Sequence, residues 1–550
     1  MIKPNQSMKT PFLTSSFFIA LLGIFALSGC DRRAQPDSAA NMVIALESPV
    51  VTLDPMRATE VFSGRVVTQI YEGLVGLDAN NRVVPVLAER WEASEDFRKW
   101  TFYVRPGVLF HPHPLVGDGR AREVTAADAA FSLTRLVSGE SPFAFALLDA
   151  IEGAADYNQG NAETVSGIVT VDDHTLELRL NFPDPFFVNR MTSQVFGIYP
   201  PEAVALGADI FGTSVAVGTG PFRMTGRRQD NRVHLEQNPQ YWGTVAGNVE
   251  AVEFRVVQND SIRLSDLRNG HIHLAHLSPG QLREVFMPDS IPSGDFEFNR
   301  TWRGRFEVAR FDVFNSHFLS LNNASLEAPL RRAITLAVDR EAIVRAVTFG
   351  AATVAPGPLP IAMHGYTPAH AADIHDLDAA AEALASSAFD SAVDRLEIIV
   401  HGREGARAVG ELLQNQLRGI GIQADLVELD FNEAFMRQIQ GDYQAAVFFF
   451  EYVFSTSGPI LENFFLPGRI PNIWNYDNPV FSERVLALRG VSEPAAMNRE
   501  VSELEAILVA EAASAFLFQQ PAILLFPSAS SGVRVNGHGM PMLKDIRLSR

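Results

Sequence analysis

The chain has 550 residues and a formal net charge of -19 at pH 7, and 47% of its residues are hydrophobic. A strongly acidic chain lacks the basic patches that neutralise phosphates, so this composition argues against nucleic acid as a partner. The length favours two or three domains, and the hydrophobic fraction is enough to fill several cores. Because Cys30 is the only cysteine, a disulfide bond is excluded, and so is a thiolate metal site.

The first 29 residues predict a cleaved lipoprotein leader. Two lysines give a basic start, residues 17–27 are apolar, and Leu27-Ser28-Gly29-Cys30 places small residues before a cysteine. We therefore expect lipidation at Cys30 and a polar tether over residues 30–41. No later apolar run reaches the ~20 residues that a membrane span needs. Loss of the leader removes two lysines and no acids, which changes the formal charge from -19 to -21.

Alternating short strands and helices are predicted between the leader and residue 196. Thr125 is a suitable N-cap for a helix over residues 125–133. Residues 168–180 alternate as two strands around Asp172-Asp173. The other predicted elements are strands over residues 41–46 and 100–108, a short helix over 65–70, and a helical, largely apolar segment over 186–196.

Residues 217–243 predict a β-hairpin that starts at a tight turn. Gly218-Thr219-Gly220-Pro221 cannot continue a helix or a central strand. Asn238-Pro239 ends the second arm, and we expect Tyr241-Trp242-Gly243 to fold back as an aromatic plug. Apolar residues alternate with polar ones on the two arms, as in strands with one buried face, at Phe222, Met224, Val233 and Leu235.

The C-terminal half predicts a mixed α/β domain. Residues 330–343 have apolar residues at helical spacing and predict one helix, with Arg331 and Asp339 holding its ends. A strand over residues 396–400, a helix over 408–417 and a strand from 421 to 426 form a βαβ unit, which implies a partly parallel sheet. The final helix is predicted over residues 504–511.

Many of these motifs, in this order, resemble the extracytoplasmic solute-binding proteins of family 5, the peptide- and nickel-binding components of ABC importers. Each motif alone is weakly specific, but together they cover nearly the whole chain after the leader. The matching segments are Leu53-Asp54-Pro55, Tyr71-Glu72-Gly73-Leu74, residues 85–91, 124–133, 218–222, 238–243, 330–343, 350–360 and 472–479.

The resemblance implies an α/β, two-lobed periplasmic-binding-protein fold (type II, cluster C) with an extra small second domain. Domain I would comprise residues 42–72, 213–316 and 516–550. Domain II would comprise residues 73–212, and domain III residues 317–515. The two lobes would close on a ligand by a hinge motion through the strands that cross between domains.

The resemblance also implies a ligand cleft between domains I and III. Oligopeptide-binding relatives use a carboxylate for the ammonium end of the peptide, and Glu451 in Phe448-Phe449-Phe450-Glu451-Tyr452 is the matching candidate. We expected it to be a buried carboxylate that the ligand pairs, although a structural salt bridge is the alternative. The spacing from Leu53 to Tyr71 is ungapped against the oligopeptide-binding relatives, so the resemblance implies that Thr59–Phe62 lie where the edge strand of those proteins meets the ligand. The full candidate set is Glu451, Tyr452, Phe448, Thr59, Glu60, Val61, Phe62, Tyr71, Phe145, Phe318, Trp474, Asn475 and Tyr476.

Motifs for catalysis are missing from the sequence, which has no GxSxG, no HExxH and no GxxxxGK. We therefore expect a binding protein that is not an enzyme and needs no cofactor. His271, His273 and His276 in NGHIHLAH are the only residues that favour a metal site, and a core strand is the alternative.

The sequence thus predicts a lipid-anchored binding protein at the periplasmic face of the membrane. It would be a monomer that captures a peptide and delivers it to an ABC permease and its ATPase. Alternatives of the same class bind another solute, such as a nickel chelate or a sugar-like molecule. A signalling receptor or a chaperone on the same fold is the alternative from a different class.

Overall fold

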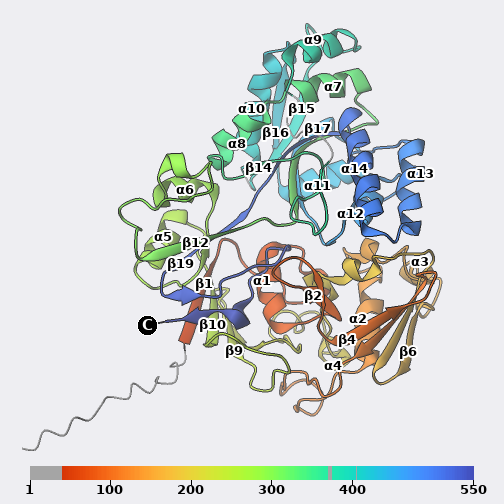
Figure 1. The fold of residues 1–550 in the computed structure, drawn as a ribbon, viewed down its shortest axis with the longest axis vertical. Coiled ribbons are helices and arrows are strands. Elements are labelled where there is room, and N and C mark those ends of the chain that lie inside the picture. The colour runs from red at the N-terminus through yellow and green to blue at the C-terminus, as the bar shows by residue number, and fades with distance from the viewer. Residues whose placement is uncertain (1–39, 369–374, 404, 550) are drawn as a thin grey trace, which may run out of the picture. The chain divides into compact units, whose positions relative to one another are not determined.

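The computed structural model describes residues 40–368, 375–403 and 405–549 (Figure 1). The predicted leader, Cys30 and nearly all of the tether lie outside these residues. Within the described ranges, no helix has both the length and the apolar character that a membrane crossing requires.

A four-stranded sheet contains both the first strand and the predicted hairpin. Its order is β1-β10-β9-β8, with β1 parallel to β10 and the other neighbours antiparallel. The hairpin prediction is confirmed, since Phe222, Val233 and Leu235 are buried on one face. The bounds are β1 Ala40–Leu46, β8 Phe222–Arg227, β9 Val233–Gln237 and β10 Val249–Val256.

A three-stranded sheet, β11-β19-β12, joins the chain's last third to its middle. It lies beside α5 and α6, and a short pair, β20-β21, completes the C-terminal region. The bounds are α5 Asp260–Arg268, β11 Ala275–His276, α6 Pro279–Val285, β12 Phe306–Phe311, β19 Ala522–Pro527, β20 Ser530–Ser531 and β21 Arg547–Leu548.

Residues 75–204 form a smaller unit around the antiparallel sheet β4-β5-β7-β6. The two strands predicted over residues 168–180 are confirmed as β6 and β7. The bounds are α1 Val61–Ile70, β2 Val75–Leu77, β3 Val83–Pro85, β4 Ala88–Ala93, β5 Lys99–Val104, α2 Ala126–Leu136, α3 Ala154–Asn158, β6 Ile168–Asp172, β7 Thr175–Arg179 and α4 Pro201–Val204.

The predicted helix over residues 186–196 is wrong in kind. The structure has two short 3-10 helices, Phe187–Met191 and Gln194–Phe196. Between them Ser193 is extended, with φ -88° and ψ 168°. An extended residue cannot continue an i→i-4 ladder, so the apolar run divides in two.

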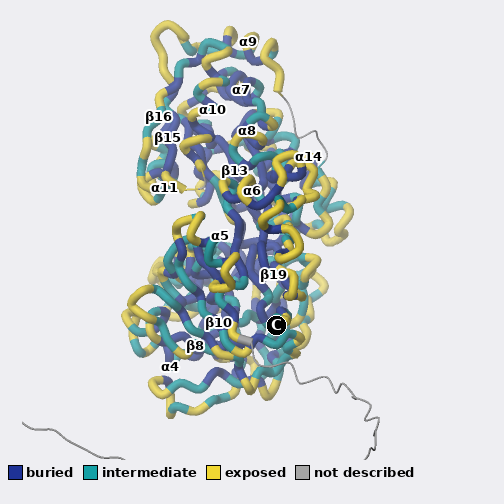
Figure 2. Tube along the Cα trace, turned by 90° about the vertical axis from the view of Figure 1, so that its left-hand side faces the viewer, coloured by how far each residue is buried: buried dark blue, intermediate teal, exposed yellow. Residues whose placement is uncertain are grey.

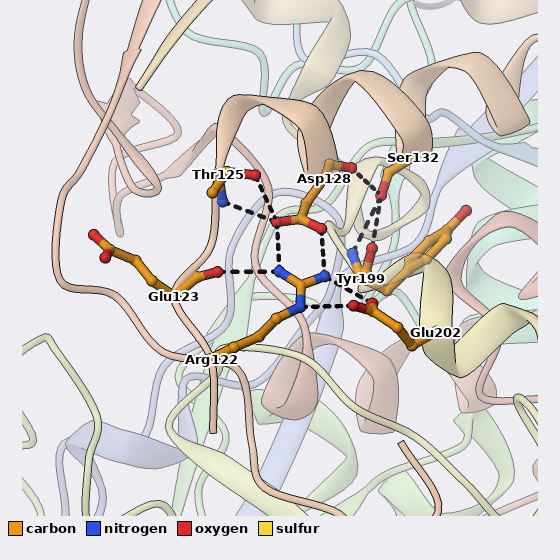
Figure 3. A network of polar contacts seen from close by, with 7 residues as sticks. All are labelled: Arg122, Glu123, Thr125, Asp128, Ser132, Tyr199 and Glu202. Atoms are coloured by element: carbon orange, nitrogen blue, oxygen red, sulfur yellow. Dashed lines mark hydrogen bonds and ion pairs between the residues drawn. The ribbon is translucent and has the colours of Figure 1, made fainter. Parts of the chain in front are cut away.

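The N-terminus of α2 carries the predicted cap and an ion network (Figure 3). Thr125 and Asp128 form a capping box. Arg122 donates to both oxygens of Asp128, at 2.9 and 2.7 Å, and to both oxygens of Glu202 on α4, at 3.0 and 2.8 Å. One guanidinium therefore joins α2 to α4 inside this unit.

A six-stranded sheet forms the core of the C-terminal part, in the order β14-β18-β13-β17-β15-β16. The predicted βαβ unit is confirmed, because β15 and β16 are parallel and α10 connects them (Figure 1). The bounds are β13 Asn315–Leu321, β14 Thr353–Val354, α9 Leu377–Ala385, β15 Leu396–His401, α10 Ala406–Arg418, β16 Ala424–Leu429, α11 Phe431–Gln440, β17 Ala445–Glu451, α12 Ser457–Phe465, α13 Pro479–Ala487, α14 Pro494–Ala510 and β18 Ser514–Gln519.

The single helix predicted over residues 330–343 is two helices, α7 Ala328–Ala337 and α8 Arg340–Thr348. Val338 and Asp339 are extended, with ψ 108° and 94°. The Asp339 side chain accepts a hydrogen bond from the Ala342 N–H at 2.7 Å, so it caps the start of a second helix instead of closing the first.

A single carboxylate, that of Glu72, joins three motifs that are distant in sequence. It accepts hydrogen bonds from Thr219 Oγ1 at 2.9 Å, Tyr241 Oη at 2.8 Å and Trp242 Nε1 at 2.8 Å. Burial raises the pKa of Glu72, and the three hydrogen bonds oppose that shift. The predicted aromatic plug is therefore a pair of donors to this carboxylate.

The glycines of the tight turn are required by close packing against the end of α1. A Cβ on Gly218 would lie 2.2 Å from the Ile70 carbonyl oxygen, and one on Gly220 would lie 2.5 Å from that of Gln69. The Gly220 N–H instead donates to the Ile70 carbonyl at 2.9 Å. This turn therefore docks directly beside Glu72.

We predict that Glu72→Leu lowers the free energy of unfolding by about 3 kcal/mol or more, because three donors lose their acceptor and each unmade buried hydrogen bond costs about 1–3 kcal/mol. Glu72→Gln keeps an acceptor oxygen and should cost less. Urea unfolding followed by circular dichroism measures both. A loss below about 1 kcal/mol for Glu72→Leu would contradict this role.

Candidate functional site

Two strands cross between the three-stranded and six-stranded sheets. The chain leaves β12 at Phe311 and enters β13 at Asn315, then returns from β18 at Gln519 to β19 at Ala522. The two connections run side by side, because β12 pairs with β19 and β13 with β18. Figure 2 shows β13 buried along its length.

The two connections are fastened to each other at Asn315. Its Nδ2 donates to the Gln520 carbonyl at 2.7 Å, and the Gln520 N–H donates to its Oδ1 at 2.9 Å. The crossing is therefore a two-strand strap whose two connections are cross-linked at Asn315.

Glu451 ends β17 directly beside this strap, opposite Asn315. The expectation of a buried carboxylate is wrong, because Glu451 is exposed. The strand ends at Glu451, so no further strand residue shields its side chain.

An aromatic platform lies on the same face of the sheet as Glu451. Residues opposite each other in an antiparallel pair share a face, and so do residues two apart in one strand. His317, opposite Phe449, is stacked between Phe449 and Phe518, with ring centroids 5.3 and 4.5 Å away. Glu451 thus stands at the end of a stack of rings in which His317 and Phe518 are buried.

A small cavity of about 10 Å³ lies beside the platform, lined by His317, His401, Phe449 and Phe518 among others. Burial lowers the pKa of His401 to about 4, so the ring is neutral at pH 7. Its Nδ1 accepts from the Arg403 N–H at 3.2 Å, which leaves Nε2 as the buried donor without a partner. The space fits about one water molecule.

Two further predicted ligand residues are buried side chains of the sheet. Phe318 and Phe448 alternate with His317 and Phe449 along their strands. Both are buried, and Phe318 packs on Trp474 at 5.0 Å. Phe448 also packs on His401 and Phe449 and lines the same small cavity.

The other predicted residues of domain III are also held by internal contacts. Trp474 stacks on Phe465 at 4.5 Å, and Tyr476 donates to Glu511 at 2.6 Å. Tyr452 donates to the Pro358 carbonyl at 3.1 Å. Asn475 has a φ of 50° in a turn and donates to Asn322 at 3.2 Å. The structure therefore gives each of these residues a packing or turn role.

The predicted edge strand over Thr59–Phe62 is wrong. Thr59 is exposed, Glu60 is the extended residue before α1, and Val61 and Phe62 form its first turn. One carboxylate oxygen of Glu60 is buried without a hydrogen-bond partner. Tyr71 is buried at the end of α1 against Tyr199.

The three histidines of NGHIHLAH have separate environments. His273 Nδ1 accepts from the Val43 N–H at 3.0 Å, His271 lies 3.3 Å from Asp266, and His276 is buried. Only Ala275–His276 of this run is strand. Over the described ranges, no group of three or more His, Cys, Asp or Glu residues is arranged to hold a metal ion.

Sequence reasoning missed a buried carboxylate on α14. Glu505 accepts from the Leu359 N–H at 3.1 Å and from the Tyr366 hydroxyl. It therefore fastens the 355–366 loop to α14. Burial raises the pKa of Glu505 to about 7.

With this geometry established, the chain can be compared with known proteins. The family model described as "Bacterial extracellular solute-binding proteins, family 5 Middle" matches residues 82–472. The chain belongs to this family. The members compared below are named as binding proteins, not as enzymes.

Two curated members illustrate the likeness in sequence. The dipeptide-binding protein of Escherichia coli K12 is 25% identical over 379 residues, which is 66% of this chain and 67% of that protein. The oligopeptide-binding protein OppA of Bacillus subtilis is 27% identical over 376 residues, 66% of this chain and 65% of that protein. The matched part is thus about two thirds of each relative.

Solved structures agree in fold over almost the full length. The Escherichia coli murein tripeptide binding protein MppA has a TM-score of 0.78 at 20% identity, covering 93% of this chain and 99% of that one. Haemophilus influenzae OppA in complex with RPPGFSPFR has a TM-score of 0.76 at 20% identity, covering 94% and 100%. The fold is therefore the two-lobed α/β fold of periplasmic binding proteins.

We predict that Glu505 makes stability fall as pH rises. Its pKa of about 7 in the folded state exceeds the ordinary 4.5, so the folded chain holds this proton more tightly than the unfolded chain. Stability is then lost between about pH 4.5 and pH 7, by roughly 3 kcal/mol at about 1.4 kcal/mol per pKa unit.

Thermal unfolding of wild type and Glu505→Gln across pH 4.5–7.5 tests this. The stability of the variant relative to wild type should increase as pH rises. Glu503→Gln, at an exposed position two residues earlier on α14, is the matched control. Parallel pH profiles for wild type and Glu505→Gln would contradict the prediction.

Proposed function

We propose that this chain is the substrate-binding component of an ABC importer and captures peptides. The observation that carries the proposal is the position of Glu451, an exposed carboxylate at the end of β17 beside the crossing strap and the His317–Phe449–Phe518 platform. An exposed carboxylate suits a ligand with an ammonium group, because the two form a charge-assisted hydrogen bond. The named relatives bind dipeptides and oligopeptides.

The proposal divides the chain into the three domains that the family resemblance implies. Domain I comprises residues 42–72, 213–316 and 516–550, domain II residues 73–212, and domain III residues 317–515. The ligand enters between domains I and III and is enclosed when the strap at Asn315 bends. The enclosed form then docks on the permease, and the chain performs no chemistry on its cargo.

Isothermal titration calorimetry with trialanine and with N-acetyl-trialanine tests the role of Glu451. Wild type should bind the free amine more tightly than the acetylated form. Glu451→Gln should weaken trialanine binding by about 2–5 kcal/mol, roughly thirty-fold to several-thousand-fold, and should leave the acetylated peptide nearly unaffected.

Glu428→Gln, at an exposed position on the edge strand β16, is the matched control and should bind like wild type. If Glu451→Gln weakens both peptides equally, Glu451 is structural. If neither peptide binds wild type, the cargo is another solute.

We also propose lipidation of Cys30, on the basis of Leu27-Ser28-Gly29-Cys30. The diacylated chain would be held at the periplasmic face of the membrane by its lipid alone. Cell fractionation should find wild type with the membrane and Cys30→Ser in the soluble fraction. Membrane retention of the variant would contradict the proposal.

A further inference from the structure

A buried ion cluster joins residues 149–190 to residues 462–489. Arg190 donates to Asp184 at 2.6 Å and lies 3.5 Å from Glu462. Glu462, on α12, also accepts from Arg489 at 2.7 Å and lies 3.6 Å from Arg469. Arg469 in turn pairs with Asp149. Two ion pairs, Arg190–Glu462 and Arg469–Asp149, therefore connect residues 149–190 to residues 462–489.

The charges of the cluster balance, with three guanidinium groups facing three carboxylates. The centre is dry, because the side chains of Arg190, Asp184 and Glu462 are 4%, 8% and 6% exposed. A buried charge that loses its partner is strongly unfavourable, so this arrangement favours the relative placement in which the partners meet.

Apolar and backbone contacts surround the cluster. Phe145 packs edge-to-face on Phe454 and Phe464, at 6.1 and 6.3 Å. The Ser455 hydroxyl donates to the Asn189 carbonyl at 3.0 Å. The Arg489 guanidinium lies 3.5 Å from the centre of the Phe182 ring. Figure 1 shows α12 and α13 next to the region that carries α2 and α3.

The position of the cluster in the chain connects it to the candidate site. Phe454 and Ser455 follow Glu451 by three and four residues, and α12 begins at Ser457. The partners on the other side belong to the unit built on the β4-β5-β7-β6 sheet. Bending at Asn315 would move Glu451 and α12 together, and it would separate this cluster.

We propose that the ion cluster is the closing contact of the binding protein, and that Arg190 and Asp149 are positioning residues for Glu451. This inference rests on the proposed function. The small second unit, residues 73–212, then takes part in ligand capture by holding the segment after Glu451. Desolvation offsets much of the Coulomb attraction in such a cluster. The cluster therefore defines the closed geometry but can still dissociate.

The first test needs no ligand. Hydrogen exchange with mass spectrometry on the ligand-free protein should show faster exchange in both 187–191 and 457–465 for Arg190→Met, by about tenfold. The matched control is Arg122→Met, which removes a guanidinium that also bridges two carboxylates but within one unit (Figure 3). It should leave residues 457–465 unchanged.

Unchanged exchange in 457–465 for Arg190→Met, or equal acceleration by Arg122→Met, would overturn the inference. Asp149 and Arg469 lie at the more exposed end of the cluster, with side chains 37% and 25% exposed. If Arg190→Met does not fold, the variants Asp149→Asn and Arg469→Gln replace it in this test. Their effects on exchange in 457–465 should be non-additive, because they break the same pair. Additive effects would contradict the proposed contact.

The second test uses trialanine as the probe. Affinity should fall about five- to tenfold for Arg190→Met and Asp149→Asn and stay within twofold for Arg122→Met, because the first two weaken closure without touching the peptide. If trialanine does not bind wild type, the peptide assignment fails while hydrogen exchange still decides the closing contact. If trialanine binds and its affinity is unaffected by both cluster variants, the positioning role is wrong.

Discussion

The carboxylate of Glu72 is the interaction on which the first half of the fold depends. It lies where the chain leaves α1, and it accepts hydrogen bonds from Thr219 in the tight turn and from the aromatic pair Tyr241 and Trp242. Because its own burial is unfavourable, those donors are obligatory. The motifs that mark the family, YEGL, GTGPF and YWG, thus form one structural unit around this carboxylate.

The second half of the fold is organised by the sheet through which the chain crosses. Placing Glu451 opposite Asn315 brings a carboxylate to the strap that would bend. The His317 ring between two phenylalanines gives that carboxylate a rigid apolar neighbour. Rigid surroundings matter for binding, because a ligand then spends less of its free energy on ordering the protein.

Local patterns in the sequence predicted local structure well. The capping box at Thr125 and the βαβ unit around α10 depend on residues close together in the chain. The prediction failed at Asp339, where a polar residue in an apolar-periodic run starts a new helix. Its side chain fits either role, and only the extended Val338 before it decides between them.

The candidate site was harder to predict, because strand register decides which face a residue occupies. Phe448 and Phe449 look alike in sequence, yet one lies in the core and the other beside Glu451. The resemblance supplied Glu451 but gave no sign of its exposure. The ion cluster could not be predicted from the sequence for a different reason. Arg190 and Glu462 are far apart in the chain, and only the tertiary structure brings them together.

The parallel pairing of β1 with β10 has a consequence for how the chain folds. Met42 lies opposite Val252, and among the described residues β1 pairs with no strand closer in sequence than β10. The strand β1 therefore stays unpaired until β10 has been synthesised and has folded. Pairing between strands so far apart in sequence is slow, because the chain loses loop entropy before stabilising contacts form. The first sheet of the chain is therefore completed only after most of its other strands have been made.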